Sequence, residues 1–214
     1  MDKYLEFLEN KKKNRKESGF KVDDQDINPK LFPFQKFCVK RALEAGKYAL
    51  FEDCGLGKTI QQLEWASKVC ERTSGSVLII APLGVVSQTI QEGVKFGYRV
   101  TEYSDNYDDG ILITNYDNLD NVDCSNFTGI VLDESSILKN FNGKTREKII
   151  ETFKATPYKL ACTATPSPND TMELCNHAEF LNVMSRNEML AMYFIHDGGS
   201  TSSWRLKGHA VRSF

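Results

Sequence analysis

Three polar motifs, each directly after a short apolar run, most constrain how this 214-residue chain folds. They are Asp53-Cys54-Gly55-Leu56-Gly57-Lys58-Thr59, Asp133-Glu134-Ser135-Ser136 and Thr163-Ala164-Thr165-Pro166. Most apolar runs of the chain are near-continuous in Val, Ile and Leu and do not alternate with polar residues. Such strands are typical of a parallel sheet that is covered on both faces. Ligands of open parallel sheets bind at the carboxyl ends of the strands, which is where all three motifs fall.

Strand patterns alternate with helical patterns along the chain. Strands are expected at residues 48–52, 76–81, 97–103, 110–115, 129–132 and 158–164. Helices are expected at residues 33–46, 58–72, 84–95, 144–155, 170–182 and 186–195. This alternation predicts an open, doubly wound α/β domain, with a mainly parallel sheet and helices on both of its faces.

Composition excludes several classes of protein. The formal net charge of -2 gives no overall basic field, so any nucleic-acid contact has to rest on local surfaces. No apolar stretch approaches the roughly 20 residues of a membrane span, and residues 1–20 lack an apolar signal core. None of the six cysteines forms a Cys-x-x-Cys pair, which favours reduced thiols over zinc ligands or disulfides. We therefore expect a cytoplasmic protein without a membrane partner.

The first motif has the composition of a phosphate-binding loop. Gly55 and Gly57 allow backbone N–H groups to turn toward phosphates, and Lys58 adds a positive charge. Thr59 opens the following helix, whose N-terminus also favours anions. Glu52 stands where the full G-x-x-x-x-G-K-[ST] pattern has its first glycine, so the match is partial.

The second and third motifs add groups that act on a bound nucleotide. Asp133 is suited to hold Mg²⁺, and Glu134 to orient and deprotonate an attacking water. The hydroxyls of Thr163 and Thr165 are suited to sense the γ-phosphate. Taken singly, an Asp-Glu pair is more often a solvated turn, and Thr-Ala-Thr-Pro a plain strand end. Their order behind a phosphate loop favours nucleotide chemistry.

The set of motifs resembles the N-terminal RecA-like lobe of superfamily-two helicases. It is most similar to Swi/Snf-type DNA translocases and their shorter phage and bacterial relatives. The segments that carry the resemblance are Pro33-Phe34-Gln35, Asp53–Thr59, Ala81-Pro82-Leu83, Asp133–Ser136, Lys139-Asn140, Thr163–Pro166, Asn169, Glu173-Leu174 and Phe180-Leu181. The resemblance covers residues 30–182.

The resemblance implies a RecA-like P-loop NTPase domain with ATP and Mg²⁺ as its cofactors. The implied nucleotide-binding residues are Gln35, which reads adenine, and Gly55, Leu56, Gly57, Lys58 and Thr59. The implied catalytic residues are Lys58, Asp133 and Glu134, and the implied metal ligands are Thr59 and Asp133. The implied coupling residues are Ser136, Thr163 and Thr165.

The resemblance also implies contacts with one strand of a nucleic acid, DNA being favoured over RNA. The residues concerned are Pro82, Leu83, Gly84, Thr114, Asn115, Tyr116, Lys139 and Asn140. Contacts of this kind with the sugar-phosphate backbone position the protein without specifying a sequence. For Thr114–Tyr116 a plain polar strand end is an equally good interpretation.

Two departures from the family pattern stand out. The motif Asp133–Ser136 is the acidic box of this family. Ser136 occupies the place where that box often has histidine, so coupling to Thr163 or Thr165 would have to pass through a hydroxyl. In addition, no second strand–helix series follows Thr165, although superfamily-two motors need a second RecA-like lobe. We expect the chain to be truncated, or the second lobe to come from another polypeptide.

The sequence therefore predicts three units along the chain, and it leaves one favoured function with two alternatives. The units are an N-terminal helix and linker at residues 1–29, an ATP-binding lobe at 30–183, and a helical extension at 184–214 that leads toward the missing lobe. The favoured function is the ATP-binding lobe of an ATP-dependent helicase or translocase that moves on DNA, most consistently double-stranded DNA. One alternative is a non-motor module that binds a nucleotide or a partner without turnover. Another is a P-loop enzyme outside the helicases, such as a kinase-like transferase.

Overall fold

A six-stranded, all-parallel sheet with the order β1-β6-β5-β2-β4-β3 forms the centre of the protein. The computed structural model describes residues 18–139, 143–197 and 203–211. The strands are β1 Lys47–Phe51, β2 Ser76–Ala81, β3 Val100–Glu102, β4 Ile111–Asn115, β5 Phe127–Asp133 and β6 Tyr158–Thr163. The predicted parallel α/β fold is confirmed.

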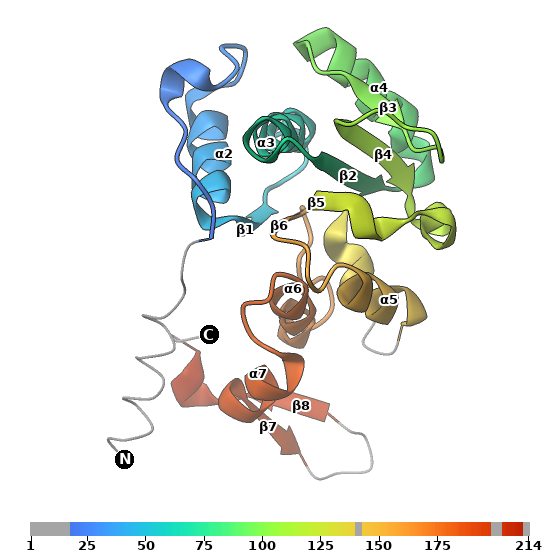
Figure 1. The fold of residues 1–214 in the computed structure, drawn as a ribbon. Coiled ribbons are helices and arrows are strands. Elements are labelled where there is room, and N and C mark those ends of the chain that lie inside the picture. The colour runs from blue at the N-terminus through green and yellow to red at the C-terminus, as the bar shows by residue number, and fades with distance from the viewer. Residues whose placement is uncertain (1–17, 140–142, 198–202, 212–214) are drawn as a thin grey trace.

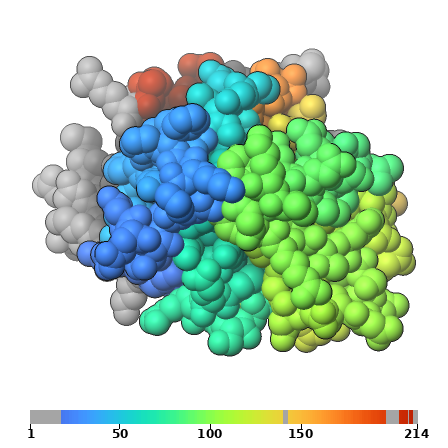
Figure 2. Space-filling view, turned by 90° about the horizontal axis from the view of Figure 1, so that it is seen from above, coloured from blue at the N-terminus to red at the C-terminus, as the bar shows by residue number. Residues whose placement is uncertain are grey.

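Helices cover both faces of this sheet (Figure 1). One face carries α2 Pro33–Ala45, α3 Lys58–Thr73 and α4 Leu83–Phe96; the other carries α5 Lys144–Thr152 and α6 Leu174–Phe180. Seen from above, the blue segment that includes α2 lies beside the green segment that includes α4, with teal between them (Figure 2). Along β2, Val77 and Ile79 join the core under α2, α3 and α4, whereas Leu78 and Ile80 join the core on the opposite face. A strand that is buried on both faces explains the unbroken apolar runs.

Short 3-10 helices connect several of these elements. They are η1 Asp24–Asp26, η2 Tyr116–Asn121, η3 Cys124–Asn126, η4 Ser135–Lys139, η5 Thr171–Glu173 and η6 Gly208–Ala210. The helix expected at residues 170–182 is divided between η5 and α6. None of the helices in the described part of the chain is both long enough and apolar enough to cross a membrane.

The C-terminal segment is only partly helical. After α7 Arg186–Tyr193, the strands β7 Phe194–Asp197 and β8 Ser203–Leu206 form an antiparallel hairpin. The expectation of a helical extension over residues 184–214 was wrong for this hairpin. Phe194 packs with Met189 and Leu190 in a small separate core. Phe194 follows Leu190 by four residues, which is a helical spacing, but its backbone belongs to the strand β7. Residues 1–17 of the expected N-terminal helix and linker lie outside the described residues.

Candidate functional site

The sheet brings the three motifs together at one edge. Strands β1, β6 and β5 are neighbours and run in the same direction, so the segments that follow them leave the sheet on the same side. In the register, Phe51 faces Thr163 and Cys162 faces Asp133. The backbone N–H of Glu52 also donates to the carbonyl of Thr163 at 3.2 Å. The phosphate loop therefore starts beside the third motif, and the acidic box lies on the other side of that motif.

The phosphate loop has the backbone conformation that its glycines predict. Gly55 and Gly57 have φ angles of 84° and 77°, a region that residues with a side chain rarely adopt. Gly57 is the N-cap residue of α3 and provides no side-chain cap for the first turn. The Lys58 ammonium donates to the carbonyls of Glu52 at 2.9 Å and Asp53 at 3.1 Å. The lysine thus folds back over its own loop.

Gln35 reaches the same loop from α2. Its Nε2 donates to the carbonyl of Leu56 at 2.9 Å, and its Oε1 accepts from the N–H of Phe32 at 2.9 Å. The approach is so close that a Cβ at Gly57 would lie 2.4 Å from Gln35 Nε2. The structure therefore brings Gln35 to the phosphate loop, and its reading of adenine stays a prediction.

Asp133 lies at the end of β5 and is buried. Its Oδ1 accepts a hydrogen bond of 2.7 Å from Gln62 Nε2 of α3. Burial raises the pKa of Asp133, and the Gln62 hydrogen bond opposes that rise. The sequence analysis did not select Gln62. A polar residue within a predicted helix gives no sequence signal of this role, and only the structure shows that Gln62 is completely buried.

Glu134 and the third motif form a short chain of hydrogen bonds. Thr163 Oγ1 donates to Glu134 Oε2 at 3.2 Å, and the N–H of Thr165 donates to Thr163 Oγ1 at 3.1 Å. The two threonines predicted to couple are therefore joined to each other and to the acidic box. In the described part of the box it is Ser135, rather than Ser136, whose hydroxyl contacts another element: it lies 3.1 Å from His177 Nε2.

The predicted nucleic-acid contacts fall into two groups. Leu83 and Gly84 are exposed at the start of α4, next to the half-buried Pro82, and Lys139 is exposed at the end of η4. Asn140 lies outside the described residues.

The second group, Thr114–Tyr116, is engaged in local structure. The Thr114 hydroxyl accepts from Asn118 at 3.2 Å, and the Asn115 side chain caps η2. The Tyr116 hydroxyl donates to the carbonyl of Asp133 at 2.7 Å, and burial raises its pKa. These contacts favour the interpretation of this segment as a polar strand end that supports the acidic box.

The donors at this edge fit a magnesium–nucleotide complex. Glycine-loop amides and the uncapped N-terminus of the 16-residue helix α3 attract phosphate oxygens. The carbonyls that now accept from Lys58 are acceptors that phosphate oxygens can replace. Asp133 and the Thr59 hydroxyl offer the oxygen ligands that Mg²⁺ prefers.

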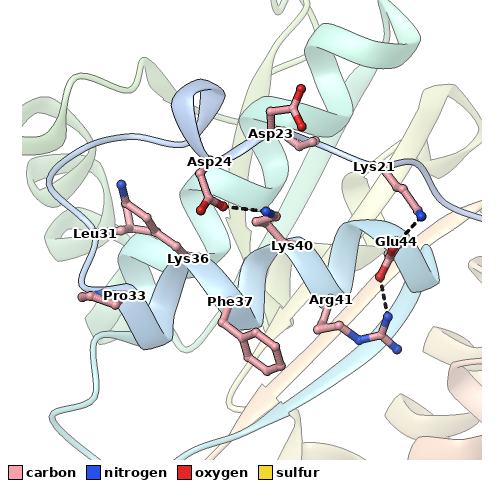
Figure 3. A pocket seen from close by; sticks show the side chains of 11 residues that line it. Lys21, Asp23, Asp24, Leu31, Pro33, Lys36, Phe37, Lys40, Arg41 and Glu44 are labelled. Atoms are coloured by element: carbon pink, nitrogen blue, oxygen red, sulfur yellow. Dashed lines mark hydrogen bonds and ion pairs between the residues drawn. The ribbon is translucent and has the colours of Figure 1, made fainter.

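A surface groove of about 700 Å³ lies elsewhere, on the outer side of α2 (Figure 3). None of the three motifs lines it. Several of its charged side chains pair with one another, including Lys40 with Asp24 at 2.5 Å and Glu44 with Lys21 at 3.6 Å. This groove is therefore not the candidate site.

A comparison with known protein families finds a match, which spans the sheet and the three motifs. The model of the SNF2-related domain family matches residues 34–191. No curated protein sequence matches the chain.

Solved structures share the fold. The SWI2/SNF2 ATPase core of Sulfolobus solfataricus in complex with dsDNA aligns with a TM-score of 0.66 and 25% identity, over 80% of this chain and 40% of that one. The SWI2/SNF2 ATPase core domain of the same organism gives 0.62 and 24%, over 80% and 39%. The UvsW helicase of bacteriophage T4 gives 0.58 and 16%, over 72% and 58%. The chain thus corresponds to less than two thirds of each of these larger proteins.

Proposed function

The chain belongs to the SNF2-related domain family, and from this premise we propose that it is the ATP-binding lobe of a translocase or helicase that couples ATP hydrolysis to movement along DNA. The observation that carries the proposal is the hydrogen bond between Thr163 and Glu134 at the edge of the sheet that also holds the phosphate loop. That bond connects the group expected to handle water with the segment expected to respond to the nucleotide.

The phosphate side of the site binds and orients ATP. Lys58 leaves the carbonyls of Glu52 and Asp53 and binds the β- and γ-phosphates together with the loop amides. Thr59 and Asp133 hold Mg²⁺, which when bound neutralises charge on the phosphates. Gln62 fixes the Asp133 carboxylate through its Oδ1, which leaves the other oxygen for the metal.

The water side of the site consists of Glu134 and the two threonines. Glu134 orients the attacking water and accepts its proton. Thr163 holds one oxygen of that carboxylate, and Thr165 holds Thr163 through its backbone N–H. A change at the γ-phosphate thus moves along β6 into the segment that leads to α6. Gln35, already bonded to the loop, reads the adenine.

The nucleic-acid track runs over the same edge of the sheet. Leu83, Gly84 and Lys139 are the exposed residues there that we propose for backbone contacts with one strand. Duplex DNA is the favoured track because a structure similar to this chain, the Sulfolobus SWI2/SNF2 core, is in complex with dsDNA.

We propose that turnover requires a second RecA-like lobe, in the same chain or from another one. In this class of motor the other lobe brings arginine fingers, and their absence costs roughly 10³-fold or more in rate. The 214-residue chain alone should therefore bind Mg·ATP weakly and hydrolyse it poorly.

The test is ATP hydrolysis by this chain and by a version that carries a second lobe. Each is assayed with duplex DNA, single-stranded DNA, RNA or no nucleic acid, beside a Lys58→Ala control. Stimulation by one nucleic acid only in the two-lobed version supports the proposal and identifies the track. Robust DNA-stimulated turnover by the single lobe refutes the requirement for a second one.

A non-motor module is the second candidate, favoured by the serine at position 136 of the acidic box. It predicts nucleotide binding without hydrolysis under any of these conditions. In that case Glu134→Gln changes nothing in the two-lobed protein, which binds the nucleotide without hydrolysing it before and after the substitution. A motor with Glu134 as its water-activating group loses hydrolysis in this variant and keeps ATP binding.

A further inference from the structure

Helix α6 contacts both ends of the turn that follows the acidic box. Asn176 Nδ2 donates to the carbonyl of Leu138 at 2.7 Å, and His177 Nε2 lies 3.1 Å from the Ser135 hydroxyl. Asn176 and His177 are buried, with 0% and 2% of their surface exposed. The two contacts hold η4, the 3-10 turn Ser135–Lys139, against α6.

The residue just before η4 has a strained backbone. Glu134 has a φ angle of 55°, in the left-handed region that residues other than glycine rarely adopt. Such a conformation persists only where the surrounding structure over-determines it. On one side of Glu134, the Tyr116 hydroxyl donates to the carbonyl of Asp133; on the other side, Ser135 contacts His177. The contact with α6 is therefore adjacent to the strained residue.

The same imidazole also contacts the strand that leads into the phosphate loop. Its ring meets that of Phe51, the last residue of β1, edge to face with centroids 5.2 Å apart. Burial lowers the pKa of His177 to about 4, so the ring is neutral near pH 7. A neutral imidazole can accept a hydrogen bond from a serine hydroxyl or donate one to it. One buried ring thus joins the start of the phosphate loop to the acidic box.

We propose that His177 is a positioning residue for Glu134: it holds Ser135, and thereby fixes the strained turn that directs the Glu134 carboxylate. The inference rests on the proposed function, in which Glu134 handles the attacking water. It also accounts for the serine at position 136. The imidazole that this box lacks comes from α6 and binds the neighbouring Ser135 instead.

Two substitutions separate the hydrogen bond from the ring contact. His177→Phe keeps an aromatic ring against Phe51 and removes the hydrogen bond to Ser135. His177→Gln removes the ring but keeps a polar atom as many bonds from Cα as Nε2. His196→Phe is the matched control, because His196 is exposed in β7. The ring contact described for His196 is with Trp204, away from the three motifs.

Two measurements on the 214-residue chain provide the readouts. Hydrogen exchange of the amides of Ser135–Lys139 reports whether the turn is held in the nucleotide-free protein. Single-turnover hydrolysis of labelled ATP, with protein in excess, gives the rate of the chemical step and the affinity for Mg·ATP separately. We expect His177→Phe to speed exchange in η4 and to lower the rate roughly 10- to 100-fold with unchanged affinity, because small misplacements of a catalytic group have effects of this size. His177→Gln should recover most of the rate.

The outcomes separate this inference from the proposed function. It is overturned if His177→Phe behaves like His196→Phe in both measurements. It is also overturned if His177→Phe speeds exchange throughout the protein and lowers affinity and rate together, because His177 is then a general core residue. If a two-lobed version of the protein shows no hydrolysis that depends on Lys58, the proposed function fails. Exchange in η4 then still decides the matter: faster exchange in His177→Phe supports a held turn, and unchanged exchange overturns it.

Discussion

At the scale of single residues, the buried pair of Gln62 and Asp133 shows how one amide donor can stabilise a buried carboxylate. Gln62 Nε2 donates to Asp133 Oδ1 at 2.7 Å, at a position where burial already raises the pKa of Asp133. Glutamate has the shape of glutamine but presents an oxygen where the amide presents its donor. In Gln62→Glu, two buried carboxyl groups would therefore share one site.

We expect Gln62→Glu to lower the free energy of unfolding by about 3 kcal/mol or more at pH 8, because a buried charge loses its partner and meets a like charge. The loss should shrink at pH 5, where one proton shared by the pair restores a donor. The measurement is urea unfolding without divalent metal at both pH values. Gln91→Glu on the exposed side of α4 is the control. Equal losses for the two variants would contradict the prediction.

Neither Gln62 nor His177 could be selected from the sequence. Each lies in a helix that the sequence predicts, but its partner is far along the chain: Asp133 for Gln62 and Ser135 for His177. Asp133, Glu134 and Thr163 were selected because each ends or follows a strand of a parallel sheet, so the topology alone places them together. Contacts that depend on which face of a helix turns inward leave no such signal.

At the scale of elements, the junction between the phosphate loop and α3 depends on a close approach by α2. Gly55 and Gly57 both have left-handed backbones, so alanine at either position costs about 1–2 kcal/mol. Only at Gly57 would the added Cβ meet another group, Gln35 Nε2 at 2.4 Å; at Gly55 nothing lies within 4 Å.

We therefore expect Gly57→Ala to lower the free energy of unfolding by about 1 kcal/mol more than Gly55→Ala, because the Gln35–Leu56 hydrogen bond is lost. The measurement is urea unfolding of both variants in the wild-type and in a Gln35→Ala background. In the second background the difference should disappear. A difference that persists without the Gln35 side chain would mean that the loop backbone alone sets the cost.

A buried lysine of β6 contacts the C-terminal end of α6. Lys159 Nζ donates to the carbonyl of Phe180 at 2.8 Å and to Asn182 Oδ1 at 3.1 Å, at the C-terminal end of α6. Burial, followed by the charge of Lys47, lowers the pKa of Lys159 to about 7. The unfolded chain therefore binds more protons than the folded one between this pH and the ordinary lysine pKa.

Stability should accordingly rise with pH above 7 through Lys159. We expect the free energy of unfolding of the wild type, minus that of Lys159→Met, to increase by about 1.4 kcal/mol per pH unit over this window. Urea unfolding of both proteins from pH 6 to pH 9 measures the difference, and titrations that the two proteins share cancel. Parallel pH profiles would show that Lys159 titrates normally in the folded state.

At the scale of the whole molecule, the parallel sheet could be predicted from the sequence, whereas the C-terminal hairpin could not. Residues such as Val77 to Ile80 are buried on alternate faces of one strand, so the apolar run itself reported a sheet covered on both sides. The hairpin of β7 and β8 has four residues in each strand, too few to establish a period of two. Its pairing brings together positions such as His196 and Trp204, which local patterns do not relate.

One buried carboxylate connects three distant segments into this architecture. Glu64 of α3, 1% exposed, accepts from the Tyr98 hydroxyl beyond α4 and from the N–H of Asn28, 3.2 Å away, in the segment before α2. The Asn28 side chain donates in turn to Tyr98 Oη at 2.9 Å and to the carbonyl of Phe96 at 3.0 Å. Burial, followed by the hydrogen bond to Glu64, raises the pKa of Tyr98. This network anchors the chain just before Gln35 enters the site.

We expect Tyr98→Phe to lower the free energy of unfolding by about 1–3 kcal/mol, because Glu64 stays buried with one donor fewer. Cleavage by trypsin after Lys30 should also become faster, because Asn28 loses a partner and the segment before α2 opens more often. Tyr158→Phe is the control: this tyrosine packs its ring against Phe20, and its substitution should cost at most about 0.5 kcal/mol. If the two variants unfold at the same urea concentration and are cut at the same rate, the Glu64 network does not hold the N-terminal segment. The position of Gln35 then depends on its own hydrogen bonds with Phe32 and Leu56.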